Sequence, residues 1–322
     1  MSSMFYSIII PVYNRPDEIR ELLQSLTDQS YQSFEVLVIE DGSDYLCKDI
    51  VDSFKDKLQV KYFFKENSGQ GFSRNVGFSM ANGDFFIVFD SDCIVPPHYL
   101  ERVNMVIQKE HIDCWGGPDR ADSSFSAIQK AINFSMTSIL TTGGIRGNKN
   151  RISQFHPRSF NMGISREVFE QTGGYRITRM GEDIEFSIRI RESGFNAVLI
   201  EDAYVYHKRR VNLSEFFKQL HFFGRARVNI SRYYPKELRF VHLFPMFFLL
   251  GLFVLPFLFI LNEFLFQSLI AIYLLYLFLI FSFALVEEQK LKIASLAVVT
   301  TVIQLVAYAI GFLTEYKRKL LE

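Results

Sequence analysis

The sequence has few cysteines, no excess of either charge and no basic segment before its first apolar run. Its three cysteines, Cys47, Cys93 and Cys114, lack zinc-site spacing and cannot all pair, so we expect a reducing, cytosolic setting. Lys plus Arg and Asp plus Glu both number 35, which favours neither nucleic acid nor another polyanion as a partner. No basic segment precedes the short apolar run 7–12, which we therefore interpret as a strand rather than a signal peptide.

Two familiar phosphate-binding loops are also missing. The Gly-rich segment 67–77 has no G-K-[ST], and its glycines are spaced too widely for G-x-G-x-x-G. The turn 12–16 after the first expected strand holds no glycine, which argues against a Rossmann NAD site and against a nucleotidyltransferase. Arg74 could hold a diphosphate with its guanidinium fork at a helix start, or it could be a solvated helix residue.

Formal charge is nearly absent from residues 240–286, where Glu263 is the only charged side chain. Three apolar stretches lie at about 240–261, 264–286 and 293–313. Each has roughly 20 residues, which is enough to span a bilayer core. We therefore predict transmembrane helices rather than a buried helix pair of a soluble domain.

The N-terminal part alternates apolar strands with amphipathic helices, which predicts a doubly wound, mainly parallel sheet. Strands are expected at 4–12, 34–39, 60–64, 85–89, 112–117, 160–165, 196–200 and 203–205. Helices are expected at 17–29, 45–54, 98–110, 123–140 and 166–171. A further helix should follow the Gly-rich loop 67–77 and end at 81, and residues 179–183 should open another that runs through 192. The basic, Gly-rich segment 141–151 is either a lid that closes over phosphates or an ordinary surface loop.

Polar residues follow several of these strands at their carboxyl ends, where ligands bind in such sheets. Asp90 and Asp92 end the apolar run 85–89, and strand alternation would point both carboxylates to one side. Paired carboxylates suit Mg²⁺ or Mn²⁺, although an aspartate could simply cap the next turn. Residues 11–15 and 40–43 end neighbouring strands, so a nucleotide pocket is plausible there.

Two further candidates have structural alternatives of similar weight. Glu182 and Asp183 open an expected helix, where acidic residues are favourable through the helix dipole alone. His207 follows an expected strand and could ligate a metal or satisfy a hydrogen bond in the core.

Taken together, five stretches in this order resemble the family 2 glycosyltransferases of the GT-A fold. They are SIIIPVYNRP, VLVIEDGSD, NSGQGFSRNVGF, FDSD and GED, and the resemblance covers about residues 4–235. The implied fold is a Rossmann-like nucleotide-sugar-binding domain with a mostly parallel, mixed sheet. The segment FKQLHFFGRAR is only loosely similar to the Q-x-x-R-W motif of processive synthases, because Phe222 and Phe223 stand where Arg-Trp would be. That departure argues against a processive polysaccharide synthase.

The resemblance also implies roles for individual residues. Pro11, Tyr13 and Asp41 would line the pocket for the donor base and ribose, with Glu40 beside them, and Arg74 would contact the diphosphate. The acidic residues and the histidine would have separate roles in metal binding, catalysis and acceptor binding. Asp92 and His207 would bind the metal, and Asp90 would lie nearer the ribose while also contributing to metal binding. Asp183 would be the catalytic base, and Glu182 would shape the acceptor site.

The chemistry expected is inverting transfer of a hexosyl group from a nucleotide sugar to an acceptor hydroxyl. A divalent Mg²⁺ or Mn²⁺ would stabilise the leaving diphosphate, and a carboxylate would take the proton of the hydroxyl. One base on the face opposite the diphosphate implies a single displacement. A UDP-sugar is the expected donor by family frequency alone.

The C-terminal part of the sequence predicts that the transfer takes place at a membrane. We expect a catalytic domain over 1–235, a basic amphipathic segment over 208–239 and a membrane domain over 240–322 with two or three crossings. Nine Lys or Arg against two Glu in 208–239 predict a cytoplasmic catalytic domain on a multi-pass protein of the inner membrane. Membrane lipids and a glycan or polyprenyl-linked acceptor, in envelope or capsular polysaccharide synthesis, are the expected partners and pathway.

The number of crossings stays open. Three full spans would place the basic tail 317–319 outside, against the positive-inside tendency. Otherwise the first stretch, which contains Pro245 and Pro256, is re-entrant and only two segments cross.

A non-catalytic membrane scaffold with a degenerate transferase domain is the remaining rival. Such a chain should have lost at least one of Asp41, Asp90, Asp92 and Asp183, and all four are present.

Overall fold

The computed structural model describes residues 4–142 and 155–321. The chain forms two compact units. The first unit comprises Met1–Asp122 and Ile145–Lys208, and the second comprises Ser123–Gly144 and Arg209–Glu322. Most of the segment 141–151, for which a lid was considered, lies outside the described residues.

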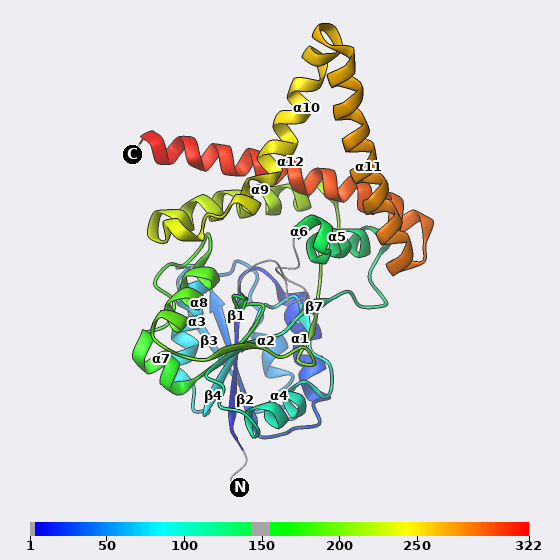
Figure 1. Cartoon of the computed structure of the whole chain (residues 1–322). Helices are drawn as coiled ribbons and strands as arrows, with labels where there is room; N and C mark the ends of the chain where they lie inside the picture. The colour runs from blue at the N-terminus through cyan, green and yellow to red at the C-terminus, as the bar shows by residue number, and fades with distance from the viewer. Residues whose placement is uncertain (1–3, 143–154, 322) are drawn as a thin grey trace. The chain divides into compact units, whose positions relative to one another are not determined.

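The first unit contains a seven-stranded sheet with the order β3-β2-β1-β4-β8-β6-β9 (Figure 1). Strands β3, β2, β1 and β4 are parallel, whereas β8 runs antiparallel to both β4 and β6. The prediction of a mostly parallel, mixed sheet is therefore confirmed. The strands are β1 (Tyr6–Val12), β2 (Phe34–Asp41), β3 (Val60–Lys65), β4 (Phe85–Phe89), β6 (Cys114–Gly116), β8 (Asn161–Ser165) and β9 (Ala197–Leu199).

A second, three-stranded sheet in the same unit brings together segments that are far apart in sequence. Its order is β5-β10-β7, and β10 pairs antiparallel with β5 and parallel with β7. These strands are β5 (Cys93–Ile94), β7 (Asp119–Arg120) and β10 (Val205–His207). The small sheet joins the residues after β4 to those around His207.

The continuous apolar strands are explained by burial on both faces of the large sheet. In β1, Ile8 and Ile10 pack into one core cluster and Ile9 packs into another, because successive side chains point to opposite faces. Helices α1 (Pro16–Thr27) and α4 (Tyr99–Ile107) contribute to the first cluster, and α3 (Gln70–Met80), α7 (Arg166–Thr172) and α8 (Glu182–Glu192) contribute to the second. The helix expected at 45–54 is reduced to the single turn of α2 (Lys48–Asp52).

The second unit is helical. Its helices are α5 (Ala127–Thr137), α6 (Ile139–Thr142), α9 (Leu213–Tyr233), the short 3₁₀ turns η1 (Pro235–Glu237) and η2 (Phe240–Leu243), α10 (Phe244–Leu261), α11 (Glu263–Glu288) and α12 (Leu291–Leu321). The single helix expected over 123–140 is interrupted at Ser138, which ends α5 in an extended conformation. Helices α10 and α11 form a hairpin (Figure 1).

Three helical segments are long and apolar enough to cross a membrane. They are Phe240–Leu261, Glu263–Glu288 and Leu291–Leu321, with mean hydropathies of 2.6, 2.7 and 2.2. They match the three apolar stretches expected from the sequence, although the third helix is longer than predicted.

Candidate active site

The turns that follow β1 and β2 are fastened to each other. Asn14 adopts a left-handed backbone conformation with φ of 53°, which asparagine tolerates better than most residues. Its side-chain oxygen accepts hydrogen bonds from the amides of Asp44 and Tyr45, at 2.8 and 3.1 Å. Pro11 is buried inside β1, whereas Tyr13 is 49% exposed just beyond it. The expected donor-pocket residues of β1 thus lie at the carboxyl edge of the sheet.

Asp41 joins the end of β2 to the Gly-rich segment. Its carboxylate accepts from the amides of Ser68 and Gly69, both at 2.9 Å, and pairs with Lys65. Burial raises the pKa of Asp41, but the ammonium of Lys65 and these amide donors outweigh burial and hold the pKa below its usual range. Asp41 is therefore an ionised group that orders the entry to α3.

Glu40 has a different environment from its neighbour Asp41. It is fully buried and accepts hydrogen bonds from the amide of Cys47 at 2.8 Å and from the hydroxyl of Tyr62 at 3.3 Å. The Ser43 hydroxyl is a third donor to it. These bonds hold the start of α2 and β3 against β2, and contact with a donor sugar nucleotide stays a prediction for Glu40.

Arg74 connects three of the sequence motifs. Its side chain is only 1% exposed, so the alternative of a solvated helix residue is wrong. The guanidinium donates to Asp90 at 2.7 Å and to Glu182 at 3.3 Å, and it lies over the ring of Tyr175. Contact of Arg74 with a diphosphate stays a prediction, and such contact would have to share the guanidinium with the two carboxylates.

The adjacent carboxylates at the start of α8 have opposite pKa shifts. Burial and the nearby charge of Asp183 raise the pKa of Glu182. Burial also acts to raise the pKa of Asp183, but the charges of Arg158 and Arg74 outweigh it and hold the pKa below its usual range. Arg158 lies 3.3 Å from Asp183, and the amide of Ile184 donates to the same carboxylate at 2.8 Å. Asp183 is thus the ionised member of the pair.

A second cluster forms where β5 pairs with β10. Cys93 and His207 face each other in the strand register, and a ligand atom from each of Asp92, Cys93 and His207 lies within 4.8 Å of the others. Nε2 of His207 is 3.0 Å from the Asp92 carboxylate, and its ring stacks on Phe160. The structure therefore brings Asp92 and His207 together from positions 115 residues apart in the numbering.

The donor set at this cluster fits a divalent cation. Asp92 offers a carboxylate oxygen and His207 a ring nitrogen, a combination that suits Mn²⁺. Burial and the neighbouring aspartates raise the pKa of Cys93 well above its usual range, and its thiol donates to the carbonyl of Phe160 at 3.4 Å. Cys93 therefore stays a neutral thiol and is not a suitable ligand for Mg²⁺ or Mn²⁺.

The sequence patterns did not indicate two residues of the site, Asp119 and Arg158. Asp119 in β7 lies 3.8 Å from Nδ1 of His207, with its side chain fully buried. It directly follows the expected strand 112–117 and Pro118, so the rule that flagged Asp41 and Asp90 would have found it. Arg158 gives no such signal, because no periodic pattern or motif surrounds it.

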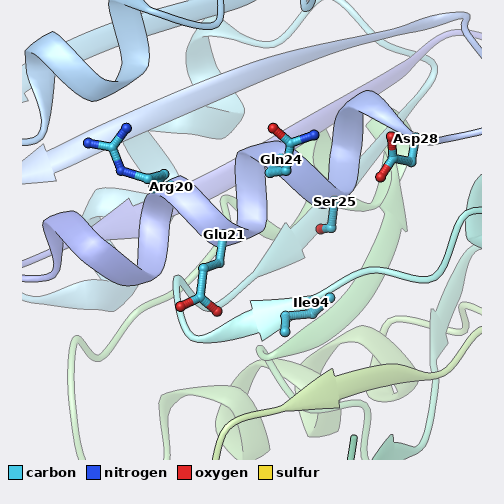
Figure 2. A pocket seen from close by; sticks show the side chains of 6 residues that line it. All are labelled: Arg20, Glu21, Gln24, Ser25, Asp28 and Ile94. Carbon is cyan, nitrogen blue, oxygen red and sulfur yellow. The ribbon is translucent and has the colours of Figure 1, made fainter. Parts of the chain in front are cut away.

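One pocket of the described part of the chain lies along α1. Arg20, Glu21, Gln24, Ser25 and Asp28 line it with Ile94 of β5 (Figure 2). None of the residues expected to bind the donor, the metal or the acceptor lines this pocket.

Comparisons with known proteins agree with this geometry. The profile described as "Glycosyl transferase family 2" matches residues 7–173, just over half of the 322-residue chain. Glycosyltransferase AglE of Haloferax volcanii is 25% identical over 232 residues, which are 70% of this chain and 74% of AglE. An uncharacterised glycosyltransferase of Rickettsia typhi is 36% identical over 107 residues, and the match spans only 33% of each chain.

Solved structures show the same fold at low sequence identity. The mannosyltransferase PcManGT of Pyrobaculum calidifontis, solved with GDP-Man and Mn²⁺, aligns with a TM-score of 0.69 and 16% identity. That alignment covers 97% of this chain and 88% of PcManGT. S. aureus TarS 1-349, solved with UDP-GlcNAc, aligns with a TM-score of 0.50 and 19% identity over 98% of this chain and 92% of TarS 1-349. Because the family profile matches over half of the chain, and because the motifs and the fold agree with that match, the chain belongs to glycosyl transferase family 2.

Proposed function

We propose that this glycosyltransferase moves a sugar from a nucleotide-sugar donor to a hydroxyl group of its acceptor, with inversion at the anomeric carbon. The observation that carries the proposal is the meeting of two motifs at Arg74. Asp90 of the D-x-D segment and Glu182 of the G-E-D segment both bind its guanidinium, at 2.7 and 3.3 Å. Asp183 is the next residue along α8, so the proposed base belongs to the same cluster as the donor-binding motif.

Asp183 is the proposed proton acceptor. An ionised carboxylate can take the hydroxyl proton as the new glycosidic bond forms, and Glu182, whose pKa is raised, is less suited to that role. If the base acts on the face opposite the leaving diphosphate, a single displacement inverts the configuration. Holding donor and acceptor in one orientation lowers the remaining barrier.

The donor is proposed to bind along the carboxyl edge of the sheet. Pro11, Tyr13 and Asp41 would contact its base and ribose, with Arg74 and Asp90 nearer the diphosphate and ribose. A divalent Mg²⁺ or Mn²⁺ held by Asp92 and His207 would supply Lewis-acid stabilisation of the departing diphosphate. The known ligands of the structural neighbours, GDP-Man and UDP-GlcNAc, support a nucleotide sugar as the donor class.

The acceptor and the location follow from the apolar helices. Helices that can span a bilayer, next to a basic amphipathic helix, support a membrane protein whose catalytic unit lies on the cytoplasmic face. A lipid-linked glycan, for example one on a polyprenyl carrier, would be presented at that face. Synthesis of an envelope or capsular polysaccharide is the proposed context.

Donor binding is the first test. Purified protein in detergent would be heated with UDP-, GDP-, dTDP- or CMP-sugars, with Mn²⁺ or with EDTA. A ligand that binds the folded state raises the unfolding temperature with the logarithm of its concentration over Kd. We expect one nucleotide class to stabilise the protein, and only when Mn²⁺ is present.

Two variants make this test specific. Asp92→Asn should lose the Mn²⁺-dependent part of the shift, whereas Asp56→Asn, the same change at an exposed turn, should keep it. Absence of a shift with every donor, in protein shown to be folded, would favour the non-catalytic scaffold. Transfer of labelled sugar from the stabilising donor to a lipid extract would then identify the acceptor class.

A further inference from the structure

The third apolar helix differs from the other two in its packing. Half of the most apolar window of α12 is buried, compared with 6% for the first helical segment and 11% for α11. The hairpin of α10 and α11 therefore presents apolar side chains on nearly all sides, as a helix surrounded by lipid does. Helix α12 has one face covered by protein instead.

Helices α5 and α9 cover that face. Ala131 and Phe134 of α5 pack against the first turns of α12, and farther along α12 its backbone touches that of α9. A Cβ at Gly224 of α9 would collide with the carbonyl oxygen of Tyr308, and a Cβ at Gly311 of α12 would collide with that of His221. Reciprocal glycines of this kind allow two helices to approach closely. The close approach therefore depends on a glycine in each of the two helices.

The contact continues along α9 in one direction. Leu220 packs in a cluster with Ala307, Arg225 and Arg232 both bind Glu315 at 3.0 Å, and Lys319 reaches Ser231 at 3.3 Å. Later residues of α9 thus meet later residues of α12. The two helices therefore run parallel and in contact over most of α9, so α12 cannot cross the hydrocarbon core along this contact without bringing α9 into it.

Helix α9 is too polar for the hydrocarbon core. Within 21 residues it carries five charged side chains, namely Glu215, Lys218, Arg225, Arg227 and Arg232. Charged side chains are costly at the centre of a bilayer, whereas a basic amphipathic helix is favourable in the headgroup region. Because α12 runs parallel to α9 and in contact with it, a crossing by α12 would draw these charges into the core, which favours an interfacial position for α12 as well.

The exposed side of α12 fits that position. Val299, Ile310 and Leu313 are 44, 38 and 50% exposed and recur at helical spacing on the face away from α9. Lys292 at the start and Lys317 near the end are exposed too. An apolar stripe between basic ends is the pattern of a helix that lies in the plane of an anionic membrane surface.

We infer that the chain crosses the membrane twice, through α10 and α11, and that α12 lies along α9 in the cytoplasmic interface. This rests on the membrane location proposed above and is independent of the transfer activity. It resolves the charge conflict, because the basic tail stays on the cytoplasmic side. It also assigns the non-crossing segment to the third apolar stretch rather than to the first, which contains Pro256 within α10.

Cysteine labelling in right-side-out membrane vesicles tests the crossings. The native cysteines are buried, so the unmodified protein supplies the background. Glu263→Cys, Lys292→Cys and Lys317→Cys would each be treated with a membrane-impermeant maleimide before and after permeabilisation. We expect Glu263→Cys to react in sealed vesicles and the other two to react at least tenfold more after permeabilisation.

Each other pattern overturns the inference. Reaction of Lys317→Cys in sealed vesicles means three crossings. Reaction of Lys292→Cys but not Glu263→Cys in sealed vesicles means that the first stretch is re-entrant. Protection of all three until permeabilisation means that the hairpin does not cross.

Depth measurements test the position of α12 separately. A fluorophore on Ile310→Cys should be quenched at least twofold more strongly by a nitroxide near the headgroups than by one near the acyl-chain ends. Leu275→Cys in the middle of α11, which is 59% exposed, is the matched control and should show the reverse order. Stronger quenching of the Ile310 position by the deep nitroxide would refute the interfacial placement.

Discussion

At the residue scale, Arg74 lies with its guanidinium enclosed by Asp90, Glu182 and the ring of Tyr175. A buried guanidinium requires such partners, because an unpaired charge in a protein interior is very unfavourable. The same positive charge, with that of Arg158, explains why Asp183 stays ionised while the pKa of its neighbour Glu182 rises. Neighbouring charges thus divide two adjacent carboxylates into different roles.

Asp183→Asn should remove the proton acceptor without disturbing the donor site. We expect turnover to fall by about 10²–10⁴-fold, which is the range of general base catalysis. The Mn²⁺-dependent thermal shift with the donor should stay within about 2 °C of the unmodified protein. Turnover within tenfold of the Asp56→Asn control would refute the assignment.

Arg158→Ala should change the pH dependence of the reaction. Arg158 lowers the pKa of Asp183, so its loss raises that pKa and the carboxylate begins to protonate at a higher pH. We expect the acidic limb of the kcat/KM profile to move to higher pH. Arg158→Lys keeps the charge and should move the limb less, and an unmoved limb in Arg158→Ala would exclude this role.

Asp119→Asn should weaken metal binding through His207. Asp119 lies beside Nδ1 and favours the tautomer that leaves the Nε2 lone pair free for a metal. Loss of such an orienting carboxylate typically costs about 10–100-fold in metal affinity. Titration with Mn²⁺, followed by the electron paramagnetic resonance of the free ion, measures this, and an affinity equal to that of Asp56→Asn would contradict it.

At the scale of elements, helix α8 and the small sheet hold the candidate catalytic and metal-binding residues. Met180 and Gly181 have φ of 65° and 100°, and this left-handed turn starts α8 immediately before Glu182 and Asp183. Strand β10 pairs with β5 and β7 and so carries His207 to Asp92 and Asp119. Each catalytic candidate is held by an element end rather than by a long loop.

Gly311→Val should disrupt the contact between α9 and α12. The branched side chain would meet the backbone at His221, which cannot move aside as a flexible side chain would. Overpacking of this kind typically costs about 1–3 kcal/mol. Thermal denaturation in detergent should show a clear loss of unfolding temperature relative to Thr314→Val, an exposed neighbour on the same helix. Equal stability of the two variants would contradict the close contact.

At the scale of the first unit, Glu35 joins segments that are distant in sequence. Its fully buried carboxylate accepts from Ser7 of β1 and the amide of Asn82, both at 2.8 Å, and pairs with Lys61 of β3 at 2.9 Å. Burial raises the pKa of Glu35, but Lys61 and the other donors outweigh burial and lower it. Glu35 therefore holds together the amino-terminal ends of β1, β2 and β3 as an ion.

Stability should consequently decline in acid. A carboxyl group whose pKa is lower in the folded state stabilises the protein above its unfolded pKa of about 4.3, and this contribution is lost as pH falls through the folded pKa. Glu35→Gln should cost about 2–4 kcal/mol at neutral pH and reduce the acid dependence. Unfolding temperatures measured from pH 7 to pH 3 test this, and an unchanged pH dependence in the variant would count against it.

For the whole molecule, the sequence alone determined much of the fold and indicated which residues are candidates for the site. Apolar runs predicted strands β1, β2 and β4, because a strand buried on both faces is mostly apolar, and they also predicted the edge strand β3. Uncharged stretches predicted the three long helices, because lipid tolerates few charges. Short motifs at strand and helix ends indicated Asp41, Asp92 and Asp183 as candidate site residues, since acidic side chains at such ends suit ligand binding, metal binding or proton transfer.

Only the tertiary structure decided which of these groups meet. The antiparallel course of β8, the pairing of Arg158 with Asp183 and the approach of Asp119 to His207 depend on contacts between distant segments. The covered face of α12 likewise appears only when α9 is packed against it. Sequence periodicity indicates which side chains of one segment face the core and which face its surroundings. It does not indicate which distant segments those side chains contact, because these contacts depend on how the segments are arranged in space.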